Sequence, residues 1–420
     1  MKNFKWLDEV TLLFSDSTRP IQSLLNFVSL MLVLWNINPE SIYYDWKLWA
    51  ILVVLWTGLA IILTGRKFID LIFKQHLWLI AVWPAYTVLL WLMGKGLSHR
   101  KFIAVAFMIL VSLYYLKTGL RKELAGLAKI GAAYLGIIAL TTLLQFITDP
   151  SIARDLAVGR GSGNFMASAL LGNFHTVYEA VLLALTLGGL LVRSKNLKLK
   201  WGWTLLLVLN LLLVGFAQYD IALISLGLGF VLLLGLSLWE HRSNRLIEKT
   251  KQPTMVEIGA TGLIYSLPAL AILIARGPLY KFIDQMDFNK VAISEKLFNR
   301  IWVYLRSLYL YMEFPAFGFG VQPDPGTFMV GQHSDYLDIL AEYGFVGFLV
   351  FLIPWIALLL AVRNELNIKA RGIYWISVII FHIMFVLNPV LEVSAITILF
   401  FILPGLCISF EEPQARMKLS

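Results

Sequence analysis

The stretch YLDILAEYGFVGFLVFLIPWIALLLAV, from Tyr336 to Val362, is the longest apolar run in this chain. A helix that crosses the hydrocarbon core of a bilayer needs roughly 20 residues, and this run provides more than that. The composition of the whole chain agrees, since 59% of its 420 residues are hydrophobic and only 15% are charged. Soluble domains are about a quarter charged, so this composition predicts a membrane protein.

Similar apolar runs recur along the chain and predict twelve membrane spans. Lipid offers no hydrogen-bonding partners, so a span of this length must be a helix that satisfies its own backbone groups. The predicted fold is therefore all-α, a polytopic transmembrane helical bundle. The spans are expected near residues 20–37, 48–64, 76–94, 102–117, 125–146, 174–192, 200–217, 220–239, 255–275, 336–362, 371–388 and 391–410.

The connection between the ninth and tenth predicted spans, residues 276–335, is much longer than most of the other links. It carries aromatic residues such as Trp302 and Tyr304 and is too apolar for a disordered tether, so we expect one or two short helices against the mouth of the bundle. The chain then divides into spans one to nine (1–275), this large extracytoplasmic loop (276–335), and spans ten to twelve with a short cytoplasmic tail (336–420).

Lysine and arginine residues give the orientation of the spans. The chain has 35 of them, and most fall in links on the same side as the N-terminus. Basic residues in short links mark the cytoplasmic side, so both termini are predicted to be cytoplasmic and the large loop to face outward. No small-residue cleavage site follows the first apolar run, which is therefore expected to be a retained span and not a secretory signal.

Charge and cysteine content exclude other classes of protein. The formal net charge is +9, but the basic residues cluster between apolar runs and form no single basic stripe. Binding to nucleic acid is therefore not expected. Cys407 is the single cysteine and lies in the last apolar run, which excludes a disulfide framework and a cysteine-rich metal site.

Candidate functional residues concentrate just before and at the start of the tenth span. Arg300 and Arg306 come first, a Pro/Gly-rich turn follows at 315–326, and His333 stands just ahead of the helix. Ser334 or Asp335 can cap that helix. One face of its first turns then presents three carboxylates at positions i, i+3 and i+7: Asp335, Asp338 and Glu342. Two glycines leave room for a neighbouring helix to approach closely: Gly344 and Gly347.

This region resembles the signature segment of the O-antigen ligase and polysaccharide polymerase family. Members carry an Arg and a Trp in a large outward loop, a P-x-x-G-x-G turn, and then a His followed by Asn or Ser, a Leu, a Glu and two glycines. The matching residues here are Arg300, Trp302, Pro315, Gly318, Gly320, His333, Ser334, Leu337, Glu342, Gly344 and Gly347.

A second outward element of that family is an Arg before a Gly-Asn-rich helix start, which Arg160, Gly172 and Asn173 match. The chain also departs from the pattern. The family's Ser-Arg-Gly, at the start of the span that begins here near Gln218, is absent, and Asp220 stands about where its Arg would be. What replaces that Arg as a phosphate contact is left open.

The resemblance implies glycosyl transfer at the outer face of a bacterial inner (plasma) membrane. The donor would be a glycan on a polyprenyl pyrophosphate such as undecaprenyl pyrophosphate, and the acceptor a sugar hydroxyl. His333 would take the proton of the acceptor hydroxyl or orient the acceptor, and Arg300 would stabilise the pyrophosphate leaving group. Further substrate contacts are expected from Arg160, Arg306, Ser334, Asp335, Asp338 and Glu342. No metal or other cofactor is expected, and flippase and chain-length regulator proteins are candidate partners.

Other functions stay open at this point. A polymerase that joins repeat units of a surface polysaccharide and a ligase that moves finished glycan to a lipid or protein share these motifs. A flippase for lipid-linked sugars also commonly has twelve spans, but it should show two similar halves, and the halves here look unlike. A structural or regulatory membrane protein would leave the His and Arg cluster unexplained.

Each candidate residue also has a simpler structural interpretation. His333 could be an interfacial helix cap, and Arg300 could pair with a loop carboxylate such as Glu295. Arg160 could contact lipid phosphates, and Asp335 and Asp338 could be in place because acidic residues suit the start of a helix.

Several polar residues fall inside predicted spans, where ionisable groups are functional candidates by default. The acidic ones lie near span ends and are expected to be within reach of water, whereas the single histidine looks deep and is expected to be hydrogen-bonded between helices. The set comprises Glu179, Asn210, Asp220, Glu257, His382 and Glu392.

Overall fold

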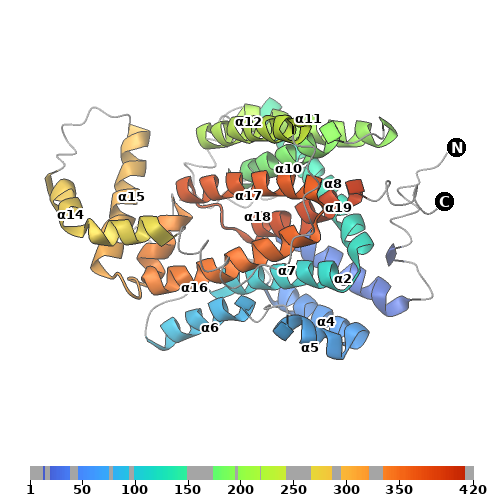
Figure 1. Ribbon diagram of the computed structural model, residues 1–420, viewed down its shortest axis with the longest axis horizontal. Helices are drawn as coiled ribbons and strands as arrows, with labels where there is room; N and C mark the ends of the chain where they lie inside the picture. Colours follow the sequence, from blue (N-terminus) through green and yellow to red (C-terminus); the bar gives the residue numbers. More distant parts are fainter. Residues whose placement is uncertain are drawn as a thin grey trace.

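We analysed a computed structural model of the 420-residue chain. The residues described here are 13–14, 19–37, 46–74, 79–93, 99–148, 174–193, 197–217, 219–242, 266–285, 295–320 and 334–411. Within these ranges every regular element is a helix, as the sequence predicts (Figure 1). The helices are α2 (Pro20–Ile37), α4 (Trp46–Thr64), α5 (Arg66–Lys74), α6 (Leu79–Leu92), α7 (His99–Lys117), α8 (Arg121–Thr148), α10 (Phe174–Arg193), α11 (Leu197–Ala217), α12 (Asp220–Arg242), α14 (Arg276–Gln285), α15 (Glu295–Glu313), α16 (Asp335–Glu365), α17 (Ile368–Leu387), α18 (Val393–Thr397), the π-helical η2 (Ile398–Ile402) and α19 (Leu403–Glu411).

Eight segments of the described chain are long and apolar enough to cross a membrane. They are α2, α4, α8, α10, α12, α16, α17 and the continuous run of α18, η2 and α19. Three further apolar helices, α6, α7 and α11, provide shorter stretches. The predicted span at 255–275 is described only from residue 266, where a helix extends to 274. The prediction of an all-helical, multi-pass membrane protein is confirmed at this level.

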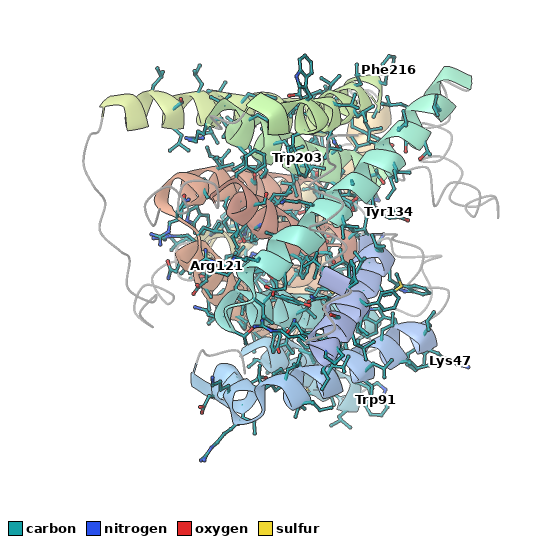
Figure 2. All side chains as sticks on the ribbon, turned by 90° about the vertical axis from the view of Figure 1, so that its right-hand side faces the viewer. Lys47, Trp91, Arg121, Tyr134, Trp203 and Phe216 are labelled. Atoms are coloured by element: carbon teal, nitrogen blue, oxygen red, sulfur yellow. The ribbon has the colours of Figure 1, made fainter. Side chains whose placement is uncertain are left out.

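In the view of Figure 1, α11 and α12 lie along one edge of the molecule and α4, α5 and α6 lie along the other. The core lies between these edges. There, 94% of the apolar segment formed by α18, η2 and α19 is buried, and 83% of the apolar segment of α10 is buried. At the edges the corresponding values are only 22% for α12 and 17% for α4. Phe216 of α11 and Trp91 of α6 are 63% and 59% exposed and lie on opposite edges (Figure 2). Apolar surface of this extent suits contact with lipid.

Two predicted spans are interrupted helices. The backbone of α16 leaves the helical conformation at Gly344, where φ is 69° and ψ is −175°. The last predicted span, 391–410, begins in an irregular link at residues 388–392 and then contains the π-helical η2 between α18 and α19. The sequence predicts both as helical spans and gives no indication of these interruptions. Non-helical backbone at membrane depth is tolerated only where protein or a water-filled cavity surrounds it, which directs attention to these two breaks.

One end of the bundle gathers basic side chains at the junctions of α7 with α8 and of α16 with α17. The Nζ atom of Lys117 lies 2.5 Å from Oε1 of Glu365, and the Arg121 guanidinium donates to the Glu365 carbonyl. The Arg371 guanidinium donates to three carbonyls at the end of α16. Figure 2 views the molecule from this end and labels Arg121. We call it the basic end, defined by Lys117, Arg121, Arg363 and Arg371.

The helices α14 and α15, which come from the long predicted loop, lie at the opposite end of the molecule (Figure 1). Two tyrosines of α15 attach it to the bundle. The Tyr304 hydroxyl donates to the Leu387 carbonyl at 2.8 Å, and the Tyr311 hydroxyl donates to the Ala269 carbonyl at 3.3 Å. The segment is therefore a packed part of the protein at this end.

Candidate functional site

The Pro/Gly-rich turn after α15 pairs its backbone with the break in α16. Four main-chain hydrogen bonds join the two segments: Phe319 N to Ala341 O (2.7 Å), Gly320 N to Glu342 O (2.9 Å), Phe345 N to Pro315 O (2.7 Å) and Val346 N to Ala316 O (3.1 Å). These bonds satisfy amides and carbonyls that lose helical partners at the break. We call the paired segments 315–320 and 341–346 the interlock.

Two glycines make the interlock sterically possible. Both have positive φ, 69° at Gly318 and 69° at Gly344, a conformation that L side chains rarely adopt. A Cβ atom on Gly318 would lie 2.5 Å from the Tyr343 amide nitrogen, and one on Gly344 would lie 2.5 Å from the Ala316 carbonyl oxygen. Since these neighbours are backbone atoms, they have little freedom to move aside.

The sequence predicts that Gly344 and Gly347 both leave room for a neighbouring helix, but the two glycines have different roles in the structure. A Cβ on Gly347 would come within 2.7 Å of the Tyr86 ring in α6, and the Tyr86 hydroxyl donates to the Tyr343 carbonyl at 2.9 Å. Close approach of a helix is confirmed for Gly347. For Gly344 the predicted partner was wrong, because the neighbour is the turn at 315–320 and not a helix.

The first turn of α16 is capped as the sequence predicts. Ser334 is the N-cap, and its hydroxyl accepts from the Leu337 amide at 3.2 Å. Asp338 is only 5% exposed. Its Oδ2 accepts from the Ser334 amide at 3.4 Å, and its Oδ1 accepts from the Ser307 hydroxyl of α15 at 2.8 Å. Asp338 therefore joins the start of α16 to the helix that carries the candidate arginines.

Asp335 joins the same turn to the break before α18. Its Oδ2 accepts from the Leu391 amide at 2.6 Å, inside the irregular link at 388–392. At the other end of that link, the Asn388 side-chain amide donates to the Tyr178 hydroxyl of α10 at 2.7 Å. The starts of α10, α16 and α18 thus meet at one place, together with the end of α17.

A buried carboxyl group lies at this meeting point. Glu179 of α10 is only 2% exposed, beside the hydroxyl of Ser394 and within electrostatic range of Glu392. The expectation that Glu179 lies within reach of water was therefore wrong, because the link and α18 cover the start of α10. We call this end of the bundle the acidic end, defined by Glu179, Asp335, Asp338 and Glu392.

The other predicted site residues are distributed as follows. Arg306 lies in the middle of α15 next to Ser307, and burial lowers the pKa of its guanidinium, which nevertheless stays cationic at neutral pH. Glu342 takes part in the interlock through its carbonyl. His333 and Arg160 fall outside the described residues, and Arg300 is described only as a backbone position in α15. Asp220 is exposed at the start of α12.

His382 belongs to a separate, apolar region. Its Nε2 accepts from the Trp355 indole at 2.9 Å, and its Nδ1 faces the Val378 carbonyl at 2.7 Å. Because a carbonyl can only accept and an indole N–H can only donate, the ring is neutral with its proton on Nδ1. The prediction of a histidine hydrogen-bonded between helices is confirmed. The ring lines an open cavity of about 260 Å³ whose other walls are Pro268, Tyr336, Phe348, Phe351, Leu352, Trp355, Phe385 and Val386.

Sequence reasoning missed three polar partners at the acidic end, which are Ser307, Asn388 and Ser394. A signal for one of them exists, since Asn388 precedes Pro389 and an Asn-Pro pair indicates a turn. That pair marks the irregular link between two predicted spans. Nothing local in the sequence indicates Ser307, because its partner Asp338 lies 31 residues away.

Taken together, these contacts make a rigid scaffold from distant parts of the chain. Hydroxyl, amide and carboxyl groups converge there beside α15, the helix that carries Arg306. Within the described residues no group of three or more His, Cys, Asp or Glu side chains could hold a metal ion. No protein-family model matches the chain, and no curated protein matches it either.

Proposed function

We propose that this protein is a membrane glycosyltransferase of the polysaccharide polymerase type. It transfers a glycan from a polyprenyl pyrophosphate carrier to a sugar hydroxyl, and so joins repeat units of a surface polysaccharide. In this proposal the chain crosses a bacterial plasma membrane twelve times with both termini in the cytoplasm. The acidic end then faces outward and the basic end faces the cytoplasm, as the distribution of Lys and Arg favours.

The observation that supports the proposal best is the interlock. The sequence pattern that resembles the polymerase and ligase family consists of two separate pieces, a P-x-x-G-x-G turn and a Glu-x-Gly-x-x-Gly helix start. These pieces pair by four main-chain hydrogen bonds in the structure, and Gly318 and Gly344 are the residues that permit the pairing. A single structural unit therefore accounts for both halves of the pattern.

The chemistry assigned to this unit needs a base and a cation. His333 directly precedes the N-cap Ser334, and it takes the proton of the acceptor hydroxyl as that oxygen attacks the donor sugar. Arg300 and Arg306 lie on α15 and stabilise the charge that develops on the departing pyrophosphate. Ser334, Asp335, Asp338 and Glu342 orient the acceptor or hold the loop that carries His333, and Arg160 adds a further phosphate contact.

The test compares two histidine variants in cells that lack the native gene. His333→Ala, produced at the wild-type level, is expected to abolish polymer on a glycan gel, because the acceptor loses its base. His241→Ala is the matched control, since residue 241 lies near the opposite end of α12 from Asp220 and should leave the polymer unchanged.

Three outcomes would change the proposal. Normal polymer from His333→Ala would refute a catalytic role for that histidine. Lipid-linked units that accumulate on the cytoplasmic side would indicate a flippase. Glycan that leaves the polyprenyl carrier for a lipid or protein, without growing on the carrier, would indicate a ligase.

A further inference from the structure

The open cavity of about 260 Å³ beside His382 is bounded by three helices. Pro268 comes from the helix at 266–274, Phe348 and Trp355 are among the residues from α16, and Val386 is among those from α17. Both α16 and α17 are long and apolar enough to cross a membrane. The cavity therefore belongs to the part of the protein that is suited to lipid surroundings. We call it the apolar cavity.

The polar groups in the walls of the apolar cavity are already engaged within the protein. The Trp355 indole donates to Nε2 of His382 at 2.9 Å, and the other ring nitrogen donates to the Val378 carbonyl at 2.7 Å. The Tyr336 hydroxyl interacts with the backbone of Ala269. The remaining wall side chains are hydrocarbon. A polar ligand would lose its hydrogen bonds to water and regain few here, so the walls favour a hydrocarbon ligand.

The apolar cavity opens toward the outer surface of the spans. Val386 is 45% exposed and Pro268 is exposed as well, whereas the inner walls are buried, with Phe348 at 1% and Leu352 at 4% exposure. Ile379, two turns before Val386 in α17, is also exposed. An exposed apolar face on a membrane-spanning helix contacts lipid, and phospholipids are the bulk solvent there. The bilayer therefore supplies the hydrocarbon that reaches this opening.

The volume indicates how much hydrocarbon can enter. A cavity of about 150 Å³ with apolar walls holds one benzene molecule, which has about six carbon atoms. In proportion, the 260 Å³ found here accommodates on the order of ten carbon atoms. Fatty acyl chains of phospholipids are of this order of length. An undecaprenyl chain is several times longer, and most of it would stay outside. The size therefore favours the acyl chain.

We propose that the apolar cavity binds one acyl chain of a membrane phospholipid. The chain enters from the bilayer past Val386 and lies against Phe348, Leu352 and Trp355. Because α17 ends at Leu387, next to the link at 388–392, the lipid comes from the leaflet at the acidic end. The chain contacts both α16 and α17 and so fixes them relative to one another. This site does not rest on the proposed glycosyl transfer, because its occupancy is measured without a sugar substrate.

The experiment maps lipid contacts on the full-length protein in vesicles of phosphatidylethanolamine and phosphatidylglycerol. A small fraction of the phosphatidylglycerol carries a diazirine near the end of one acyl chain, and light couples it to the nearest side chain. Mass spectrometry then locates the label residue by residue. We expect label on buried Leu352 several-fold above that on Leu183 of α10, which is completely buried and gives the background. Label on Val231 of α12, which is 65% exposed, measures contact with bulk lipid.

Variants at the opening test whether the label on Leu352 comes from a chain inside the apolar cavity. Val386→Trp fills the opening and is expected to lower that label several-fold, with the label on α12 unchanged. Since Val386 is partly exposed, the larger side chain does not overpack a buried core. Val386→Leu adds a single methylene and should lower the label less. Val231→Trp is the matched control, an exposed valine of another span, and should leave the label on Leu352 as in the wild type.

The proposal is overturned if Leu352 of the wild type carries no more label than Leu183, or if Val386→Trp leaves the label on Leu352 unchanged. A competition arm distinguishes the two sources of hydrocarbon. Undecaprenyl phosphate, added at the same molar fraction as the probe, is expected to lower the label no more than unlabelled phosphatidylglycerol does. A larger decrease would identify a polyprenyl chain as the occupant and overturn the proposal. Failure of the His333→Ala test would leave these results unaffected, so the two proposals fail separately.

Discussion

At the basic end of the bundle, Lys117 reaches Glu365 across a partly exposed contact, with side chains that are 12% and 23% exposed. At the acidic end, by contrast, Asp335 and Asp338 are 8% and 5% exposed and accept hydrogen bonds from backbone amides. Long side chains thus make the contacts at one end, whereas short carboxylates make them at the other. Because short side chains have fewer rotatable bonds, we infer that the acidic end is the more rigid of the two.

This difference is informative about function. A site that performs chemistry needs its groups held within a fraction of an ångström by rigid surroundings, and short buried carboxylates provide that better than long, flexible side chains do. Basic side chains near the membrane surface serve mainly to fix orientation. The comparison therefore favours the acidic end as the place for a site, and the next substitutions test how far the two ends really differ.

The largest effect is expected from Gly344→Ala. The added Cβ would lie 2.5 Å from the Ala316 carbonyl oxygen, and φ at this position is 69°. Left-handed backbone strain and overpacking together should lower the free energy of unfolding by about 3 kcal/mol or more. The measurement is equilibrium unfolding of the purified protein in detergent.

Gly58→Ala is the matched control for that substitution. Gly58 lies inside α4, and a Cβ there would meet nothing within 4 Å. Alanine also has the higher helix propensity, so this variant should be as stable as the wild type or slightly more stable. If both variants had the same free energy of unfolding as the wild type, the interlock would not be a rigid element.

A smaller loss of stability is expected from Asp335→Ala. It removes the acceptor for the Leu391 amide and leaves that buried donor unsatisfied, which should cost about 1–3 kcal/mol. Asp335→Asn keeps one acceptor oxygen and should recover part of the loss. Hydrogen exchange of the peptide that contains Leu391 gives a local measurement, and faster exchange is expected for the alanine variant. Equal exchange in both variants and the wild type would contradict the contact.

The sequence predicted the helices well because apolar length is a local property. The runs that became α12 and α16 could be read directly, and Ser334 was one of the two cap candidates, with Asp335, at the start of the apolar run. The breaks were missed for a physical reason. Gly344 looks like a packing glycine until its partner Ala316 is known, and that partner is 28 positions earlier in the chain.

The candidate site was predictable in outline only. The pattern from Pro315 to Gly347 identified the two segments that pair, but it gave no indication that they pair through their backbones. Burial of Glu179 was missed because its depth depends on α18, more than 200 residues later. Contacts of this kind depend on tertiary structure, and no periodicity in a single segment encodes them.

The smallest effect is expected at the basic end, from Glu365→Gln. The substitution removes the ion pair with Lys117 but keeps the main-chain carbonyl to which Arg121 donates, so one of the two contacts survives. Because the pair is partly exposed, its loss should lower the free energy of unfolding by about 1 kcal/mol or less. That difference should shrink as salt is added, since salt screens exposed charges, whereas the effect of Asp335→Ala should not. A loss at Glu365 as large and as insensitive to salt as that at Asp335 would mean that both ends are equally rigid, and the structural argument for a site at the acidic end would then fail.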